Sequence, residues 1–184
     1  MKRPKYKSLR DLLKHELVKK EEEKTAELIK QLRPVRKRKY LTREELEEIC
    51  YWKSPRAIRQ IQRTHSKKIE RTTKQALSTR SERKRIELLT SLRGVSLPMA
   101  SAILTLIWPE RYGVIDIRVW KLLYALKSVQ TKPSGIGFNF NNWYHLLCKL
   151  RYHAKELKTT VRAVERTLFH YHKTLQQGTL YKKK

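Results

Sequence analysis

The spacing of apolar residues along this chain constrains its fold more than any other feature. Leucine, isoleucine, valine and tryptophan recur three or four residues apart in most segments, which is the period of an amphipathic α-helix. Only five glycines occur in 184 residues, and each lies between two such segments rather than inside an alternating pattern. We therefore predict an all-α protein whose helices are joined by short turns.

Capping signals locate individual helices. Thr42 followed by Glu45 is a capping box, and Ser54 before Pro55 is typical of an N-cap and a first helical turn. The basic segment 33–39, which follows the first helix, is expected to be a linker. The periodic segments predict the remaining helices at 9–32, 66–77, 81–92, 97–108, 116–124, 143–157 and 161–175.

The charge balance indicates the kind of partner. With 44 Lys and Arg against 17 Asp and Glu, the formal net charge is +27, which favours binding to a polyanion. Nucleic acid is the first candidate because its closely spaced phosphates release counterions when basic residues bind them, although an anionic membrane surface would also attract this charge. No apolar run approaches the ~20 residues of a membrane span, and the first residues lack the apolar stretch of a secretory signal. We therefore expect an intracellular protein, cytoplasmic, nucleoid-associated or nuclear, that does not enter membranes.

The residues that usually bind metals do not form a metal-site pattern. Cys50 and Cys148 have no CxxC or Cys/His spacing, which argues against a zinc knuckle, an iron–sulfur cluster and a disulfide scaffold. His170 and His172 are two apart on a predicted helix and therefore point to different faces. We expect no metal and no cofactor.

The most informative segment runs from 92 to 104 and reads LRGVSLPMASAIL. It predicts a helix, a tight turn at Gly94 and a second, apolar helix, which together form a helix-hairpin-helix motif within about residues 81–108. Such a turn presents backbone N–H groups, and its second helix a positive N-terminal end, to a phosphate group. These contacts hold a DNA backbone without reading base sequence. The expected backbone-binding residues are Arg93, Gly94, Val95, Ser96 and Pro98.

From about 88 to 120 the chain resembles the helix-hairpin-helix (HhH-GPD) base-excision DNA glycosylases. The pattern of that family is L-P-G-V-G, two variable residues, an alanine near the start of the second helix, and V-D-T-x-V after a short loop. The family aspartate lies 18 positions after the site where some members carry a catalytic lysine, and in this chain Asp116 lies 18 positions after Pro98. Matching positions are occupied by Leu92, Gly94, Val95, Ala100, Ile115, Asp116 and Val119.

The resemblance implies a fold, a partner and a reaction. It implies a monomer with two helical lobes, one formed by 42–109 and containing the hairpin, the other formed by 1–41 together with 110–184. Double-stranded DNA would lie against the hairpin, and a damaged or mismatched base would leave the stack and enter the cleft between the lobes. Asp116 would stabilise the oxocarbenium-like sugar that forms as the N-glycosidic bond breaks, or orient the attacking water.

Three departures from the family pattern limit what the resemblance implies. Pro98 occupies the position of the catalytic lysine, and proline cannot form a Schiff base, so we expect a glycosylase without abasic-site lyase activity. Ser96 replaces the second glycine of the hairpin, and Arg93 follows Leu92, where it would add a phosphate contact. The iron–sulfur cysteines of one branch are missing, while the resemblance still allows a monovalent cation at the hairpin.

A flipped base needs a pocket that stacks against it. Trp52 is favoured for substrate contact because it lies between two predicted helices, whereas Trp120 lies on an apolar stripe that also suits core packing. Asp116 likewise has an alternative role, since an aspartate before an apolar helix is a common N-cap. The candidate pocket or cleft residues are Tyr51, Trp52, Tyr112, Arg118 and Trp120.

Two other functions fit the same residues. A non-catalytic DNA-binding protein would use the hairpin and the basic surface in a structural or accessory role, and it would not need Asp116. A basic RNA-binding or ribosome-associated protein would bind RNA in preference to duplex DNA.

Overall fold

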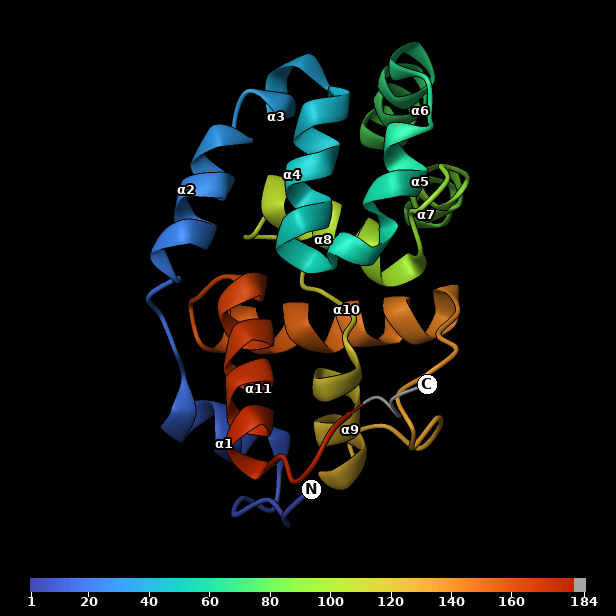
Figure 1. Cartoon of the computed structure of the whole chain (residues 1–184). Coiled ribbons are helices and arrows are strands. Elements are labelled where there is room, and N and C mark those ends of the chain that lie inside the picture. Colours follow the sequence, from blue (N-terminus) through green and yellow to red (C-terminus); the bar gives the residue numbers. More distant parts are fainter. Residues whose placement is uncertain (181–184) are drawn as a thin grey trace.

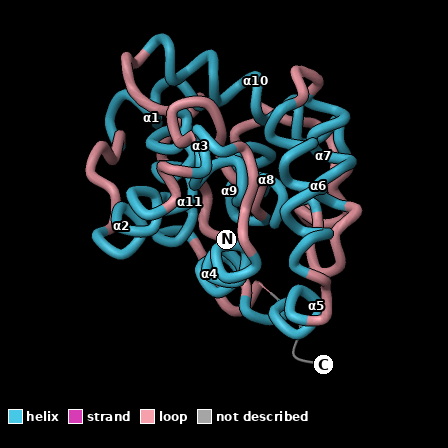
Figure 2. The backbone as a smooth tube through the Cα atoms, turned by 90° about the horizontal axis from the view of Figure 1, so that it is seen from above, coloured by secondary structure: helices cyan, strands magenta, loops and turns pink. Residues whose placement is uncertain are grey.

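The computed structural model describes residues 1–180 and contains, within them, eleven α-helices and one 3-10 helix but no β-strand (Figure 1). This confirms the all-α prediction, and loops join the helices throughout (Figure 2). No helix in this part of the chain combines the length and the apolar character that crossing a membrane requires. The α-helices are α1 (Leu9–Glu16), α2 (Glu23–Gln31), α3 (Val35–Arg38), α4 (Arg43–Lys53), α5 (Ile58–Gln62), α6 (Ser66–Ser78), α7 (Glu82–Thr90), α8 (Leu97–Ile107), α9 (Ile117–Ala125), α10 (Phe140–Glu156) and α11 (Val161–Leu175), and the 3-10 helix η1 spans Pro55–Ala57.

Several helices begin at the capping residues that the sequence indicates. The Thr42 side chain accepts the Glu45 N–H, and the Glu45 side chain accepts the Thr42 N–H, which completes the predicted capping box of α4. Asp116 is the N-cap of α9 and accepts a backbone N–H two residues further along the chain. Asn139 and Asn142 form a second capping box, which fixes the point where the long loop ends and α10 begins.

The predicted single helix at the N-terminus is divided in two. Residues 17–22 leave the helical conformation between α1 and α2. The Val18 N–H donates to the Thr167 hydroxyl at 3.0 Å, and the Val18 carbonyl accepts from the Arg166 guanidinium at 2.6 Å. The prediction of one helix over 9–32 is therefore wrong, because these contacts with α11 outweigh local helix propensity.

The basic segment 33–39 is not an open linker. It contains the short helix α3, in which Val35 is fully buried. Lys39 ends this helix in the left-handed conformation, with φ 65°. The Arg36 guanidinium donates to the Ile107 carbonyl at 2.6 Å and joins the segment to the end of α8. Part of the positive charge of the predicted linker therefore has a structural contact.

The helices form two groups. α4, α6, α7 and α8 pack in one group, with α2 against α8, whereas α1, α9 and α10 pack against α11 in the other. Figure 1 shows the first group at the top of the view and the second at the bottom, with the segment between α8 and α9 connecting them. The sequence placed all of 1–41 in the second group. In the structure α2 packs against α8, and Figure 1 shows α3 beside the first group.

The segment after α8 is attached to the core by a buried serine. Residues 99–107 of α8 are all buried, as their apolar sequence predicts. The Ser101 hydroxyl donates to the Pro98 carbonyl at 2.8 Å and accepts the Ile115 N–H at 3.1 Å. Because Asp116 is the next residue, this contact fixes its position relative to the hairpin.

Candidate functional site

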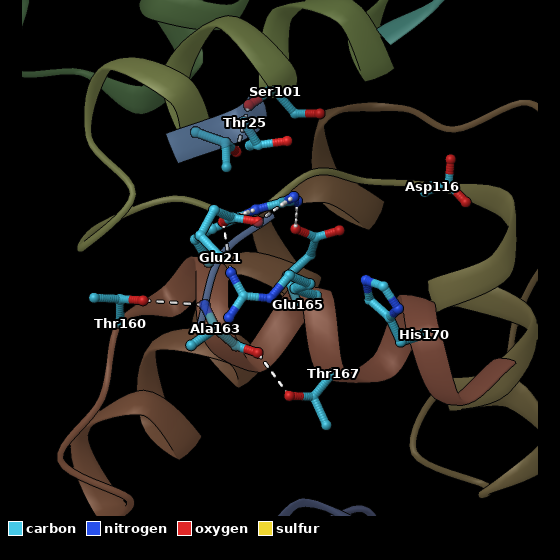
Figure 3. A network of polar contacts seen from close by, with 12 residues as sticks. Glu21, Thr25, Ser101, Asp116, Thr160, Ala163, Glu165, Thr167 and His170 are labelled. Carbon is cyan, nitrogen blue, oxygen red and sulfur yellow. Dashed lines mark hydrogen bonds and ion pairs between the residues drawn. The ribbon is translucent and has the colours of Figure 1, made fainter. Parts of the chain in front are cut away.

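Asp116 lies at the start of α9, on the segment that connects the two groups of helices. Its Oδ1 accepts the Arg118 N–H at 2.8 Å, which is the N-cap bond, and its Oδ2 accepts from the Lys53 ammonium at 2.8 Å. The residue is 8% exposed, and Figure 3 shows it near Glu165 and His170. One oxygen therefore has a structural hydrogen bond and the other a charged partner.

Lys53 is a site residue that no sequence pattern indicates. It is the last residue of α4, and its side chain is 17% exposed. A lysine at the end of a helix is usually explained by its favourable interaction with the helix dipole. Lys53 and Asp116 are 63 positions apart, so only the folded chain brings the amine and the carboxylate together.

A cleft of about 820 Å³ opens beside this ion pair. Part of its lining comes from residues 96–99 at the start of α8, and another part from loop residues 135–138. Lys53, Asp116 and Arg118 also line it. The volume is typical of a ligand-binding site, and the hairpin and the candidate carboxylate border the same space.

A smaller cavity of about 180 Å³ shares part of its lining with the cleft. The shared residues are Lys53, Asp116 and Phe169, so the ion pair borders both spaces. A protein cavity of about 150 Å³ is known to hold one benzene molecule, which gives the scale of a guest that fits here. The other lining residues are Glu22, Thr25, Trp52, Val114, Arg162, Glu165, His170 and Lys173.

Trp52, the aromatic residue favoured from the sequence, lines the small cavity. Its indole N–H donates to the Thr25 hydroxyl at 3.0 Å. The Arg162 guanidinium lies 5.3 Å from the ring centroid, which is within range of a cation–π interaction. Trp52 is therefore held in a fixed orientation at the cavity wall.

Arg118, one of the candidate cleft residues, lines the cleft. Its guanidinium lies 5.2 Å from the centroid of the Phe169 ring. The buried Nε has no hydrogen-bond partner among the described residues. Because the Arg118 side chain lines the cleft, its positive charge suits an anionic group such as a phosphate there.

Three of the predicted pocket residues line neither the cleft nor the small cavity. Tyr112 is buried, its hydroxyl donates to the Glu82 carboxylate at 3.0 Å, and burial raises its pKa. Trp120 is buried too, and its indole N–H donates to the Thr131 carbonyl at 2.9 Å. Tyr51 is exposed on the surface. The structure therefore does not bring these three side chains to either space, since Tyr112 and Trp120 pack in the core and Tyr51 faces solvent.

The hairpin contains the tight turn that the sequence predicts. Gly94 has φ 81°, and a Cβ there would lie 3.1 Å from the Ala57 carbonyl oxygen, so the position favours glycine. Val95 is buried, whereas Arg93 is exposed. Ser96 is the N-cap of α8, but its side chain makes no capping hydrogen bond. The first N–H groups of α8 therefore have no partner from this side chain.

A second group of buried charges, the arginine cluster, lies beside the small cavity (Figure 3). It consists of Glu21, Arg162, Glu165 and Arg166. Arg162 contacts Glu21 at 3.0 Å and Glu165 at 2.5 Å, and Arg166 contacts Glu21 at 2.7 Å. Burial raises the pKa of Glu165 although Arg162 opposes this, whereas for Glu21 the effect of burial is overcome by the two arginines, which lower its pKa.

Metal-binding side chains are not grouped in residues 1–180. Nowhere in this part do three or more His, Cys, Asp or Glu side chains come together as a metal ion would require. Cys50 is buried and Cys148 is exposed, and both are free thiols. The Leu89 and Leu92 carbonyls at the hairpin already accept backbone N–H groups at 3.2 and 3.1 Å, and we assign no role to the monovalent cation that the resemblance allows.

Comparison of the chain with protein-family models, with curated proteins and with solved structures finds no match. Its function is therefore inferred from its own residues and their geometry. The features that bear on function are the hairpin, the cleft beside it and the ion pair of Lys53 with Asp116.

Proposed function

We propose that this protein is a DNA glycosylase that excises a damaged or mismatched base from duplex DNA by hydrolysing its N-glycosidic bond. The observation that carries the proposal is the position of Asp116, which borders both the cleft beside the hairpin and the small cavity. If a flipped base occupies the small cavity, its sugar lies at the boundary of the two spaces. The Asp116 carboxylate would then be next to the bond that breaks.

The hairpin and the positive charge support a duplex DNA partner. The start of α8 offers N–H groups and the positive end of a helix to a phosphate, and Arg93 adds an exposed cation on the same turn. The Arg118 side chain lines the cleft and adds a positive charge that suits a phosphate there. With a net charge of +27, binding should weaken steeply as salt is added.

The chemistry follows from the cation that forms on the sugar. Base removal passes through an oxocarbenium-like state, and a fixed carboxylate beside it stabilises that charge or orients the attacking water. The N-cap bond and Lys53 hold the Asp116 carboxylate in place, while Trp52 offers apolar surface to the base. Because Pro98 has no side-chain amine that could act as the nucleophile, we assign base removal to water. The protein would act as a monomer and without a cofactor.

The test is a panel of duplexes that carry uracil, an oxidised purine or an alkylated purine. After incubation with the protein, alkali converts each abasic site into a strand break that a denaturing gel resolves. We expect excision of at least one of these lesions and none from an undamaged duplex of the same sequence. Absence of excision from every lesion duplex would contradict the proposal.

One observation favours a different function. Both oxygens of Asp116 already have partners, as a purely structural N-cap and ion pair would have. The protein would then hold duplex DNA through the hairpin and the basic surface without acting on it. It would bind undamaged duplex in a salt-dependent way, and binding would not change in Asp116→Asn. If RNA displaced the duplex in a competition assay, an RNA-binding protein would be favoured instead.

A further inference from the structure

Lys53 is the only lysine among the described residues that line the cleft. Its Nζ lies 2.8 Å from Asp116 Oδ2, and Lys53 also lines the small cavity. The proposed function places the deoxyribose of the flipped nucleotide at the boundary of these two spaces. The amine and the carboxylate would therefore both face that sugar.

The use of lysine distinguishes this ion pair from the other buried pairs. In the described part of the chain, four other ion pairs have both side chains less than one-fifth exposed, and all four use arginine. Arginine keeps its charge and matches a carboxylate with two donors, which suits a purely structural pair. Lysine differs because it can lose a proton and act as a nucleophile.

We propose that Lys53 forms a Schiff base with the abasic deoxyribose that base removal leaves, and that the protein then cleaves the strand on the 3′ side of this site. The inference rests on the proposed function, because the abasic sugar is its product. Base removal remains a reaction of water beside Asp116, and strand cleavage is a second step. The expectation of no lyase activity depended on Pro98 of α8, but Lys53 of α4 lines the same cleft.

The step needs only these two side chains and water. Asp116 accepts a proton from the Lys53 ammonium, and the neutral amine attacks C1′ of the open-chain aldehyde. Loss of water gives a protonated imine, which makes the proton on C2′ acidic. When water removes that proton, the C3′–O bond breaks and the phosphate leaves with the electron pair as a 5′-phosphate end. Hydrolysis of the imine then releases an unsaturated aldehyde and restores the amine, so no oxidant or reductant is consumed.

The experiment uses the full chain and a duplex with one preformed abasic site, so that it does not depend on base excision. Sodium borohydride reduces the imine to a secondary amine and joins the protein to the DNA covalently, which a denaturing gel detects. We expect wild-type protein to give this adduct. Without borohydride and without alkali, it should cleave the strand 3′ to the site. A duplex whose abasic sugar has been reduced to the alcohol is the control, because it has no aldehyde.

Lys53→Arg is the main variant, because arginine keeps the positive charge beside Asp116 but does not form the imine. We expect the yield of adduct and of alkali-independent cleavage to fall by at least about 100-fold. Lys121→Arg is the matched control, since Lys121 lies on α9 close to Asp116 in sequence but lines neither space. It should form the adduct like wild type. Thermal melting and duplex binding show whether each variant is folded.

The outcomes separate this inference from the proposed function. An equal yield of adduct from Lys53→Arg would overturn it and indicate another amine, and absence of adduct from wild type would overturn it as well. If alkali reveals excision of a lesion but no adduct forms, Lys53 has no such role and the glycosylase proposal stands. If the adduct depends on Lys53 but no lesion is excised, the role of Lys53 is supported and the glycosylase proposal fails.

Discussion

Two of the groups of opposite charges that the protein buries are built differently. The arginine cluster joins two glutamates to two arginines of α11, and most of its contacts are made within that helix or with the segment 17–22. The other group, the cleft pair, consists of Lys53 and Asp116. It borders both the cleft and the small cavity. The two groups are close enough for Lys53 and Asp116 to act electrostatically on the Glu165 carboxyl.

The arginine cluster mainly joins segments of the fold and reaches only the small cavity, through Arg162 and Glu165, whereas the pair of Lys53 and Asp116 borders both spaces. In the arginine cluster, Arg166 also binds the Val18 carbonyl, so the charges attach residues 17–22 to α11. In the cleft pair, the cation is a lysine and the anion faces open space. Loss of a charge from the arginine cluster should therefore reduce stability, and loss of a charge from the cleft pair should reduce activity.

Arg166→Met should give the largest loss of stability. Arg166 is buried, contacts Glu21 at 2.7 Å and donates to the Val18 carbonyl at 2.6 Å. Removing one partner of a buried ion pair typically costs about 3–5 kcal/mol, and since Glu21 keeps another arginine we expect about 3 kcal/mol in urea unfolding. Arg10→Met breaks an exposed pair with Glu156 and should have a much smaller effect. If Arg166→Met kept wild-type stability but lost excision, the two groups of charges would not differ in role as proposed.

His172 gives a pH-dependent test near Asp116, whose charge acts on it electrostatically. It is buried, and burial together with Arg118 and Lys121 lowers its pKa from 6.5 to about 4. Protonation therefore favours the unfolded state, so stability should fall as the pH decreases from about 6.5 to about 4, by up to about 3 kcal/mol. His172→Leu should remove this part of the acid sensitivity in urea unfolding, whereas His65→Gln, at an exposed position, should not. An unchanged pH dependence in His172→Leu would show that His172 is not a buried neutral group.

Arg93 belongs to neither group and should give the smallest effect. It is exposed on the hairpin, so Arg93→Gln removes at most one phosphate contact. We expect duplex affinity to fall by roughly 3- to 10-fold and the salt slope to decrease by about one, as measured by fluorescence anisotropy at several salt concentrations. Excision at saturating protein should be unchanged, and an altered choice of lesion would mean that Arg93 contacts more than the backbone.

Features determined by neighbouring residues could be predicted from the sequence. The caps at Thr42 and Asp116 depend on side chains within three positions, and both form as expected. The turn at Gly94 follows from the conformational freedom of glycine. The burial of α8 follows from its nearly uniform apolar sequence.

Features that depend on distant segments could not be predicted in this way. The Lys53 and Asp116 pair joins residues 63 positions apart, and the break at 17–22 is caused by contacts with α11. The role of Trp120 could not be predicted either, because the sequence pattern of an aromatic residue on an apolar stripe is the same for a core residue and for a pocket residue. Only the packing of helices decides between these roles.

Single-turnover base release by Asp116→Asn tests the central claim most directly. Asparagine has a similar shape and caps a helix as well as aspartate does, so the fold and the hairpin should remain while the carboxylate charge is lost. On the lesion duplex that wild type processes fastest, we predict a fall in the rate of base release of at least about 100-fold. Duplex affinity should stay within about twofold of wild type. Base release at the wild-type rate would show that Asp116 only caps α9 and would contradict the proposed reaction.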